Sequence, residues 1–448
     1  MVQKCFIIRR KNINLKEIYK VKVVIMAGGK GTRIVSINAE VPKPMICVND
    51  KPILEHQIES LTKQNLKDII LVIGYKGEVI EEYFEDGSKF GVCIEYIKEE
   101  MPLGTAGALY FLKDRIKEDF FLINGDIIFD VDFHRFYQYH QSNNGIATIL
   151  THPNSHPYDS GVIVADKTGK VTKWMTKEEK RLWYKNCVNA GIHILSPEIF
   201  DKFETLEKKD LDRDILKELI REEKLYIYQS PEYVKDMGTP DRFYAVQEDI
   251  RTGLVAGKNL NQKQKAIFLD RDGTINKYVG FLRNVDEMQL IESVSTAVKK
   301  INTSGYLAII ITNQPVIARG ETSFEELEEI HNKMETLLGN DGAYLDDIFY
   351  CPHHPDKGFV GERIELKIDC ECRKPKPGLF IEAAEKYNID LENSWMIGDT
   401  LSDMEAGKNA GCNTILCGTD HEYQGVQFEK LEECVDYILR LERDKVRC

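Results

Sequence analysis

A short apolar run that ends in two acidic residues constrains the fold of this chain more than any other feature. Residues 266–269 read Ala-Ile-Phe-Leu, and Asp270-Arg-Asp272-Gly-Thr follows at once. Such a run predicts a buried strand. Side chains alternate along a strand, so Asp270 and Asp272 leave its carboxyl end on the same side, where open α/β sheets place their ligands. Two carboxylates there can hold Mg²⁺, one attacking phosphorus and the other handling the leaving-group proton.

Apolar periodicity in the rest of the chain predicts the α/β class. Both halves alternate short β-branched strands with amphipathic helices, the pattern of a mainly parallel sheet. One helix is predicted to begin at Ser323, with Glu326 completing a capping box. It would bury a single stripe at helical spacing, formed by Phe324, Leu327, Ile330, Met334 and Leu337.

The chain, at 448 residues, is long enough for two domains. Residues 251–264 are rich in Gly, Asn, Gln and Lys and lack apolar periodicity, which predicts an unstructured linker. We therefore expect two Rossmann-like domains, at residues 21–250 and 265–448. Residues 1–20 form an N-terminal extension that matches no motif.

Three further motifs follow the acidic strand. Thr312-Asn313 ends a second apolar run, Arg373-Lys374 supplies cations, and Asp399 and Asp403 supply late carboxylates. In this order, the motifs resemble those of the haloacid dehalogenase-type phosphatases. The resemblance implies a parallel sheet with Mg²⁺ on Asp270, Asp272 and Asp399. It assigns catalysis to Asp270, Asp272, Thr312 and Lys374, and substrate binding to Asn313 and Arg373.

Two short pairs of metal-ligand residues lie just before Arg373. Cys351-Pro-His353 and Cys370-Glu-Cys372 are separated by a loop, a spacing that predicts a closed tetrahedral Zn²⁺ site. His354 is the alternative fourth ligand. Four protein ligands leave no position for water, so this zinc would be structural and would organise the loop.

The C-terminal motifs together resemble the D,D-heptose 1,7-bisphosphate phosphatase family over residues 265 to about 420. Histidinol-phosphate phosphatases share much of the pattern and are the nearest competitor. Pro315-Val316 stands where the heptose phosphatases usually have Ser-Gly, and Thr400 where they have lysine. These departures bear on which substrate is used.

A second set of motifs lies in the N-terminal half. The apolar run 23–27 enters Gly28-Gly29-Lys30-Gly31-Thr32-Arg33, a turn whose backbone N–H groups can approach phosphates closely. Lys43 adds a cation between two prolines, and the segments 102–107 (Pro-Leu-Gly-Thr-Ala-Gly) and 124–126 (Asn-Gly-Asp) follow. The series resembles the sugar-1-phosphate nucleotidyltransferases over residues 22 to about 250.

This second resemblance implies a mixed sheet and the following roles. Gly28, Gly29, Gly31 and Thr32 would hold the nucleoside triphosphate, with Gly104 and Thr105 against its base. Arg33 and Lys43 would stabilise developing charge, and Asp126 and Asp236 would bind Mg²⁺. Asn189, Gly161 and Lys177 would lie on the sugar side, although a solvated lysine in the charged run 177–181 is nearly as good an interpretation of Lys177.

Composition excludes several classes of partner. The formal net charge of −13 argues against nucleic acid and anionic membranes, because both require a basic surface. No apolar run reaches the length of a membrane span, and Arg9, Arg10 and Lys11 interrupt the start where a secretory peptide would stay apolar. We expect a cytoplasmic protein whose 11 cysteines are thiols and metal ligands.

The two resemblances predict one bifunctional enzyme for nucleotide-activated heptose and surface glycans such as lipopolysaccharide. The phosphatase would remove the 7-phosphate of a heptose 1,7-bisphosphate, and the transferase would activate the resulting 1-phosphate, with GTP favoured by the resemblance to heptose- and mannose-1-phosphate guanylyltransferases. The alternatives are a hexose-1-phosphate transferase joined to another small-ester phosphatase, or one half acting as a non-catalytic binding module. A homo-oligomer is compatible with the sequence.

Overall fold

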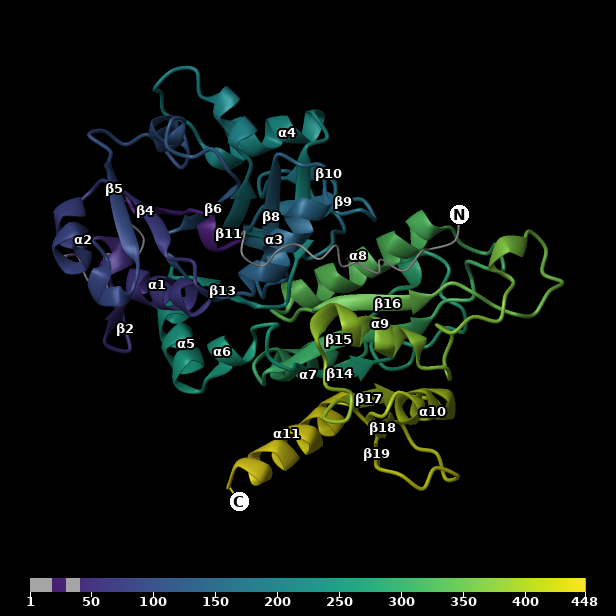
Figure 1. Cartoon of the computed structure of the whole chain (residues 1–448). Coiled ribbons are helices and arrows are strands. Elements are labelled where there is room, and N and C mark those ends of the chain that lie inside the picture. The colour runs from purple at the N-terminus through teal and green to yellow at the C-terminus, as the bar shows by residue number, and fades with distance from the viewer. Residues whose placement is uncertain (1–17, 30–40, 448) are drawn as a thin grey trace.

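The computed structural model describes residues 18–29 and 41–447, which form two α/β domains that pack against each other (Figure 1). The N-terminal domain contains a nine-stranded mixed sheet of order β10-β9-β11-β6-β1-β4-β5, with β8 paired to β11 and β12 paired to β8. Its strands are β1 (Val23–Met26), β4 (Asp68–Ile73), β5 (Cys93–Lys98), β6 (Phe120–Asn124), β8 (Ala147–His152), β9 (Val162–Ala165), β10 (Val171–Met175), β11 (Val188–Leu195) and β12 (Leu225–Gln229).

Two small sheets accompany the large one. They pair β7 (Ile127–Asp130) with β13 (Tyr233–Asp236), and β2 (Cys47–Val48) with β3 (Lys51–Pro52). The α-helices of this half are α1 (Ile53–Lys63), α2 (Gly77–Phe84), α3 (Phe133–Ser142), α4 (Lys217–Arg221), α5 (Pro240–Arg251) and α6 (Leu254–Gly257).

Alternation along β1 divides the N-terminal core into two layers. Val23 and Ile25 pack with residues of α1, α2 and α3 on one face of the sheet. Val24 packs on the other face, with residues of α4 and of the short helices before it. Because both faces are covered, the central strands are apolar throughout rather than alternating with polar residues.

The C-terminal domain has a six-stranded sheet of order β16-β15-β14-β17-β18-β19, in which every pair is parallel. The strands are β14 (Lys265–Leu269), β15 (Tyr306–Asn313), β16 (Asp347–Cys351), β17 (Trp395–Gly398), β18 (Asn413–Cys417) and β19 (Gln427–Phe428). Ile267 and Leu269 of β14 pack with α7 (Val294–Asn302), α8 (Phe324–Asn340) and α11 (Leu431–Arg447). Ala266 and Phe268 face α9 (Gly378–Tyr387) and α10 (Leu401–Asn409). The predicted combination of a mixed and a parallel sheet is confirmed.

Helix α8 begins as the sequence predicts but buries more than one stripe. Ser323 Oγ accepts a hydrogen bond from Glu326 N at 3.0 Å, and Ser323 N donates to Glu326 Oε2 at 2.7 Å. Leu338, rather than Leu337, belongs to the core. The helix also buries a polar and small-residue face, which hydrophobic periodicity could not reveal: His331, Glu335, Thr336 and Gly339.

The segment expected to be an unstructured linker is ordered, and this corrects the sequence-based expectation. Residues 254–257 form α6, and the three residues that follow are buried. Lys258 Nζ donates to Tyr306 O at 3.1 Å, and Asn259 Nδ2 donates to Asp130 Oδ1 at 2.6 Å. These polar side chains look like linker residues in the sequence, but they satisfy buried acceptors in both domains.

Residues 1–17 of the expected N-terminal extension lie outside the described residues, and residues 18–20 form a short 3₁₀ helix. Within the described part of the chain, no helix is both long enough and apolar enough to cross a membrane.

Candidate functional sites

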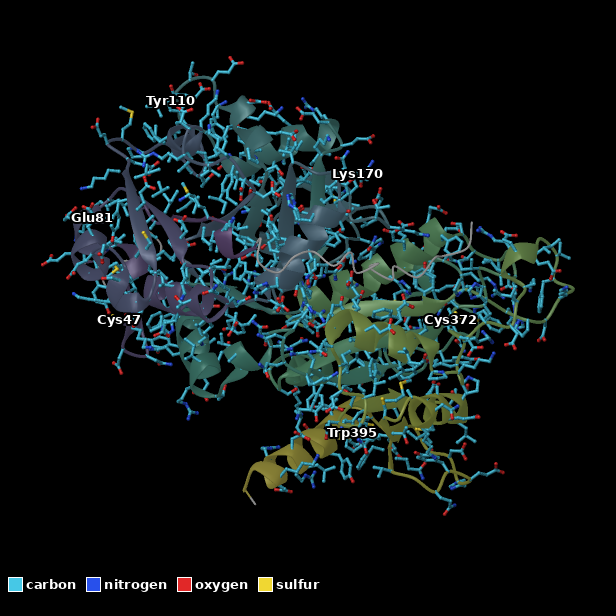
Figure 2. The ribbon with its side chains drawn as sticks, viewed as in Figure 1. Cys47, Glu81, Tyr110, Lys170, Cys372 and Trp395 are labelled. Carbon is cyan, nitrogen blue, oxygen red and sulfur yellow. The ribbon has the colours of Figure 1, made fainter. Side chains whose placement is uncertain are left out.

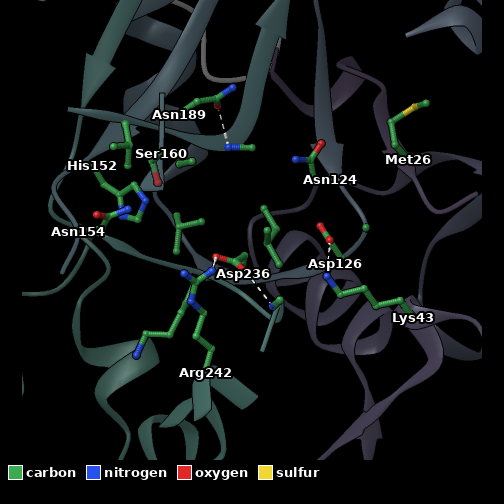
Figure 3. Close-up of a pocket in the computed structure, with 18 of the residues that line it drawn as sticks. Met26, Lys43, Asn124, Asp126, His152, Asn154, Ser160, Asn189, Asp236 and Arg242 are labelled. Carbon is green, nitrogen blue, oxygen red and sulfur yellow. Dashed lines mark hydrogen bonds and ion pairs between the residues drawn. The ribbon is translucent and has the colours of Figure 1, made fainter. Parts of the chain in front are cut away.

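A cavity of about 1350 Å³, lined by the N-terminal domain and in part by the C-terminal domain, gathers many of the residues predicted from the sequence (Figure 3). Its lining reaches from the first glycine turn, across the ends of β6 and β11, to the end of β13. The predicted residues in this lining are Gly28, Gly29, Lys43, Gly104, Thr105, Asp126, Asn189 and Asp236.

The pairing of β7 with β13 brings the two predicted metal ligands of this cavity together. Asp236 lies opposite Ile127 in the antiparallel register, and Met237 N donates to Asp126 O at 3.1 Å. Residues 110 positions apart in the sequence therefore share one edge of the cavity. Two carboxylate side chains at such an edge are ligands that suit Mg²⁺.

Each of these two carboxylates is paired with a cation in the structure. Lys43 Nζ lies 2.6 Å from Asp126 Oδ2, and Arg242 Nη1 lies 2.6 and 2.8 Å from the two oxygens of Asp236 (Figure 3). Burial opposes ionisation of Asp236, but the Arg242 guanidinium and the Gly238 N–H outweigh it and lower the pKa of Asp236. The Asp236 side chain thus stays negative at the floor of the cavity.

Two glycines permit the close backbone approach that the glycine-rich motifs predict. A Cβ on Gly28 would lie 2.5 Å from Glu99 Oε2 and 3.3 Å from Gly74 N. Gly104 has a φ of +82°, and a Cβ there would lie 2.4 Å from Lys209 O. Any other residue at these positions would move the wall of the cavity.

Some predicted residues of the N-terminal site are not brought to the cavity. Lys177 is exposed and does not line it, and neither does Gly161, which packs against the Trp174 indole instead. Asn189 does line it, and its Oδ1 accepts from Gly191 N at 2.9 Å. Gly31, Thr32 and Arg33 lie outside the described residues.

A second cluster of charged groups lies at the carboxyl ends of β14 and β17. One oxygen from each of Asp270, Asp399 and Asp403 falls within a group whose members all lie within 4.8 Å of one another, so these carboxylates could hold a cation. Lys374 Nζ lies 2.5 Å from both Asp270 and Asp403 and donates to Ile311 O at 2.8 Å. Asp399 Oδ1 is buried and has no hydrogen-bond partner among the described residues, so the residues present fit a bound cation.

Burial dominates the acid–base properties of this cluster. It raises the pKa of Asp270 to about 7, against the opposing charge of Lys374. Burial and the neighbouring Asp403 raise the pKa of Asp399 to about 6. Carboxylates held this close repel one another, so a bound cation would favour their ionised forms.

The Asp272 side chain is not part of this group, which differs from the expectation that it would be a metal ligand. Its carboxylate accepts hydrogen bonds from Arg271 Nη2 at 2.9 Å, Gln314 Nε2 at 2.9 Å and Asn276 Nδ2 at 3.0 Å. Burial would raise the pKa of Asp272, but the Arg271 charge and these hydrogen bonds lower it. Asp403, rather than Asp272, is the third carboxylate of the group with Asp270 and Asp399.

The other predicted residues of this site hold its loops together. Gln314 Nε2 donates to Thr312 Oγ1 at 2.9 Å. Asn313 makes two hydrogen bonds with the Lys374 backbone, at 3.0 and 3.1 Å. Arg373 Nη1 donates to His353 O at 3.2 Å, which ties the cationic segment to the cysteine-rich loop.

The cysteine-rich loop brings together the four predicted zinc ligands. The Sγ atoms of Cys351, Cys370 and Cys372 lie 3.3 to 3.5 Å apart, and His353 Nδ1 lies 3.3 Å from Cys372 Sγ. Tetrahedral Zn²⁺ with bonds of about 2.3 Å to sulfur needs sulfur–sulfur edges of roughly 3.8 Å, slightly longer than these. His354 is engaged elsewhere, with Arg319 at 3.3 Å and Asp356 N at 3.2 Å. Figure 2 shows Cys372 here, whereas Cys47 lies in the other domain.

Sequence reasoning missed several residues that complete these sites. Arg242, which holds Asp236, follows it by six positions inside a helix, where an arginine carries no motif signal. Asp403 was recognisable as an acid of the late motif, but only the first turn of α10 turns it back toward Asp270. Thr400, the departure from the phosphatase pattern, is the N-cap of that helix, and its Oγ1 donates to Asp403 Oδ2 at 2.6 Å.

Comparison with known proteins assigns each half to a family. The nucleotidyl transferase family model matches residues 22–253, and an HAD-hydrolase-like model matches residues 371–440. The chain is 43% identical over 158 residues to D-glycero-beta-D-manno-heptose-1,7-bisphosphate 7-phosphatase of Pasteurella multocida, which is 35% of this chain and 83% of that protein.

Two further similarities fall in opposite halves. Probable mannose-1-phosphate guanylyltransferase 1 of Oryza sativa subsp. japonica is 33% identical over 225 residues, 49% of this chain and 62% of that protein. The chain therefore spans less than two thirds of this transferase. A crystal structure of D,D-heptose 1,7-bisphosphate phosphatase from B. bronchiseptica with magnesium and phosphate superposes with a TM-score of 0.35 and 30% identity, covering 40% of this chain and 99% of that one.

Proposed function

We propose a two-step function for this chain, which belongs to the nucleotidyl transferase family over residues 22–253 and, in its C-terminal part, to the HAD-like phosphatase family that includes the Pasteurella multocida enzyme. The C-terminal site removes the 7-phosphate of a heptose 1,7-bisphosphate. The N-terminal site then transfers a nucleotidyl group, from GTP in our proposal, to the heptose 1-phosphate and releases pyrophosphate. The proposal includes a cytoplasmic setting and a role in surface glycan assembly.

The observation that carries the proposal is the presence of two separate acidic sites in one chain, each with cations beside its carboxylates. In the C-terminal site, Asp270 is the nucleophile that attacks the phosphorus of the 7-phosphate. Lys374, 2.5 Å away, orients the carboxylate and offsets its charge. Asp272 is held at hydrogen-bonding geometry by Arg271 and Gln314, and it handles the proton of the departing sugar hydroxyl.

In the N-terminal site, catalysis consists of positioning and charge stabilisation. A sugar 1-phosphate oxygen attacks the α-phosphorus of the nucleoside triphosphate in line, and no covalent intermediate with the protein is needed. Lys43 and the backbone N–H groups of the Gly28–Gly29 turn meet the negative charge of the phosphates, together with Arg33 in our proposal. Asp126 and Asp236 are the carboxylates that would hold Mg²⁺ in this cavity.

Metals enter the proposal at three positions. Mg²⁺ on Asp126 and Asp236, and on Asp270, Asp399 and Asp403, would neutralise phosphate charge and orient phosphate oxygens. Zn²⁺ on Cys351, His353, Cys370 and Cys372 would have a structural role, since all four ligands come from the protein.

A panel of substrates tests the function directly. Purified protein is incubated with heptose 1,7-bisphosphates of both anomers, histidinol phosphate, and hexose bisphosphates, and inorganic phosphate is measured. Pyrophosphate is measured separately, with heptose, mannose and glucose 1-phosphates against GTP, ATP, UTP and dTTP. The expected result is phosphate from a heptose bisphosphate and pyrophosphate from a heptose 1-phosphate. Turnover of histidinol phosphate alone would contradict the heptose assignment.

Mannose 1-phosphate is the second candidate substrate of the transferase half. The similarity to a probable mannose-1-phosphate guanylyltransferase favours it. A kcat/KM for mannose 1-phosphate above that for every heptose 1-phosphate would favour this candidate. The two domains would then catalyse unrelated reactions.

A further inference from the structure

A loop of the nucleotidyltransferase cavity rests on the phosphatase domain. Asn154, Ser155, His156 and Asp159 line the cavity, together with Lys299 and Gly342 from the C-terminal domain. The loop includes the short 3₁₀ helix Pro157–Asp159, and Pro157 is buried. One wall of the first site is therefore formed by residues of the second domain.

Helix α8 contacts this loop too closely for any side chain at Gly339. A Cβ built on Gly339 would lie 2.7 Å from Pro157 Cγ and 3.2 Å from Pro157 Cδ. Beyond the end of α8, Gly342 also lies beside the loop, where a Cβ would be in ordinary van der Waals contact with Ser155 O at 3.6 Å. Figure 1 shows α8 running along the boundary between the domains. A proline ring cannot swing aside as a long side chain does, so the helix and the loop constrain each other.

Buried hydrogen bonds fix the same helix to the segment 184–186, which precedes β11. Tyr184 N donates to Thr336 Oγ1 at 2.9 Å, and Asn186 N donates to Glu335 Oε2 at 3.2 Å. The Asn186 side chain then bonds the Asn154 backbone twice, at 3.1 and 2.7 Å. These bonds connect α8 to the first residue of the loop.

The loop in turn holds the cation that orients Asp236. His156 Nδ1 lies 2.9 Å from Asp159 Oδ1 and 3.3 Å from Arg242 Nη2. The other nitrogen, Arg242 Nη1, forms the ion pair with Asp236. A shift of the loop would therefore move Arg242 and the carboxylate that it holds.

We propose that helix α8 of the phosphatase domain is a positioning element of the nucleotidyltransferase site, acting through Gly339 against Pro157 and through Glu335 and Thr336 against residues 184–186. It sets the loop 154–159, which Arg242 links to Asp236 on the side of the cavity where Asn154 and Asn189 lie (Figure 3). We place the sugar 1-phosphate on this side, because Asn189 is the lining residue predicted for the sugar. This inference rests on the proposed nucleotidyl transfer. Gly339, Glu335 and Thr336 are positioning residues, because none of them lines the cavity.

Replacement of Gly339 with alanine tests the proposal in the full-length protein. The added Cβ pushes Pro157 away, and misplacement by about 1 Å costs up to roughly a hundredfold in a preorganised site. We expect the KM for the sugar 1-phosphate to rise at least about fivefold. The KM for the nucleoside triphosphate and the kcat/KM for phosphate release should each change by less than about twofold, since α8 contacts the phosphatase site through His331, whose Nε2 lies 3.2 Å from Arg271 Nη1, and not through Gly339. Gly257→Ala is the matched control, because a Cβ there meets nothing within 4 Å.

A double-mutant cycle shows whether the contact itself is responsible. In a Pro157→Ala background the ring atom that meets the new Cβ is gone, so Gly339→Ala should have little further effect on the KM for the sugar 1-phosphate. An equal rise in both backgrounds, or no rise in either, would overturn the proposal.

If Gly339→Ala does not fold, Thr336→Val tests the same positioning role of α8. It removes the acceptor of Tyr184 N without changing the volume, and a rise of at least about twofold in the same KM is expected, with phosphate release unchanged. An unchanged KM overturns the proposal. If wild-type protein releases no pyrophosphate with any sugar 1-phosphate, the proposed function fails instead, so the two failures are distinct.

Discussion

At the residue scale, Asp270 and Asp272 acquire different properties although one residue separates them. Asp270 faces Lys374 and two further carboxylates, and burial raises its pKa to about 7. Asp272 faces Arg271, Gln314 and Asn276, which lower its pKa. Their environments differ although their chemical type is the same, and a cation bound beside Asp270 would favour its ionised, nucleophilic form.

Asp270→Asn should abolish phosphate release and leave pyrophosphate release intact. An amide cannot form the acyl phosphate, so a loss of more than about 10³-fold is expected. The measurement is kcat/KM for both reactions of the same preparation. Asp114→Asn is the control, because the Asp114 side chain is 99% exposed. If the Asp270 variant still releases phosphate, Asp270 is not the nucleophile.

Asp126→Ala should have the opposite selectivity. It removes a carboxylate that lies 2.6 Å from Lys43 in the first cavity, and the second site contains neither residue. Pyrophosphate release should fall at least about a hundredfold while phosphate release stays within about twofold. Loss of both activities together would show that the two sites are not independent.

At the element scale, the cysteine-rich loop and helix α8 both depend on contacts that hydrophobic periodicity does not reveal. The loop between His353 and Cys370 exposes Val360 and Ile364, and it is held by the ligand cluster and by contacts such as the hydrogen bond from Arg363 N to Ala318 O at 3.0 Å. Helix α8 has an ordinary apolar stripe and, in addition, a buried polar face covered by the other domain. That second face has no periodic signal, since it consists of a histidine, a glutamate, a threonine and a glycine.

Cys370→Ser should reduce bound zinc from one ion per chain and weaken binding of the bisphosphate. The cluster holds the loop to which Arg373 is bonded through His353 O, so we expect KM for the bisphosphate to rise more than kcat falls. Elemental analysis and steady-state kinetics are the measurements, with exposed Cys93→Ser as the control. Stoichiometric zinc in the Cys370 variant, or no zinc in the wild type, would show that the proposed zinc site does not exist.

Glu335→Gln should change how stability depends on pH. Burial raises the pKa of Glu335 from 4.5 to about 7, despite the opposing charge of Lys185 and with a small further rise from Asp347. Between these two values only the unfolded chain loses the proton, so the wild type loses stability as pH rises from about 4.5 to 7. Glutamine keeps an acceptor for Asn186 N and does not ionise, so the variant avoids this loss.

The difference in unfolding free energy, variant minus wild type, should therefore rise between pH 5 and pH 8 by up to roughly 3 kcal/mol. Denaturant unfolding at both pH values measures it. A difference that is the same at pH 5 and pH 8 would show that Glu335 ionises normally in the folded protein.

At the scale of the whole molecule, the two sites lie at opposite ends of the phosphatase sheet. Asn302 and Thr303, just before β15, line the large cavity, whereas Thr312, near the end of β15, belongs to the phosphatase site. The eight residues of β15 span roughly 26 Å. The residues that line the large cavity include none of Asp270, Asp399 and Asp403.

We therefore expect the heptose 1-phosphate to pass through solvent between the two reactions. With labelled bisphosphate as substrate and unlabelled heptose 1-phosphate in the mixture, the label in the nucleotide sugar should be diluted in proportion to the unlabelled pool. Product mass spectrometry measures the dilution. Label that resists a large excess of unlabelled sugar would demonstrate channelling.

Local signals determined much of this protein from the sequence alone. The acidic strand end at 266–272, the glycine turns and the capping box at Ser323 each depend on a few adjacent residues, because backbone geometry and side-chain alternation act over that range. The cluster of four potential metal ligands was also recognisable, since short ligand pairs can chelate with little loss of entropy. The two domains and their sheet types follow from these motifs and from the resemblances they carry.

Only the tertiary structure decided which distant residues meet. Asp126 and Asp236 converge through the register of β7 with β13, and Asp403 joins Asp270 through the first turn of α10. The order in residues 254–264 and the buried polar face of α8 depend on the packing of one domain against the other. Such contacts join side chains far apart in the sequence through the shape of the folded core, and no local pattern of apolar and polar residues encodes that shape.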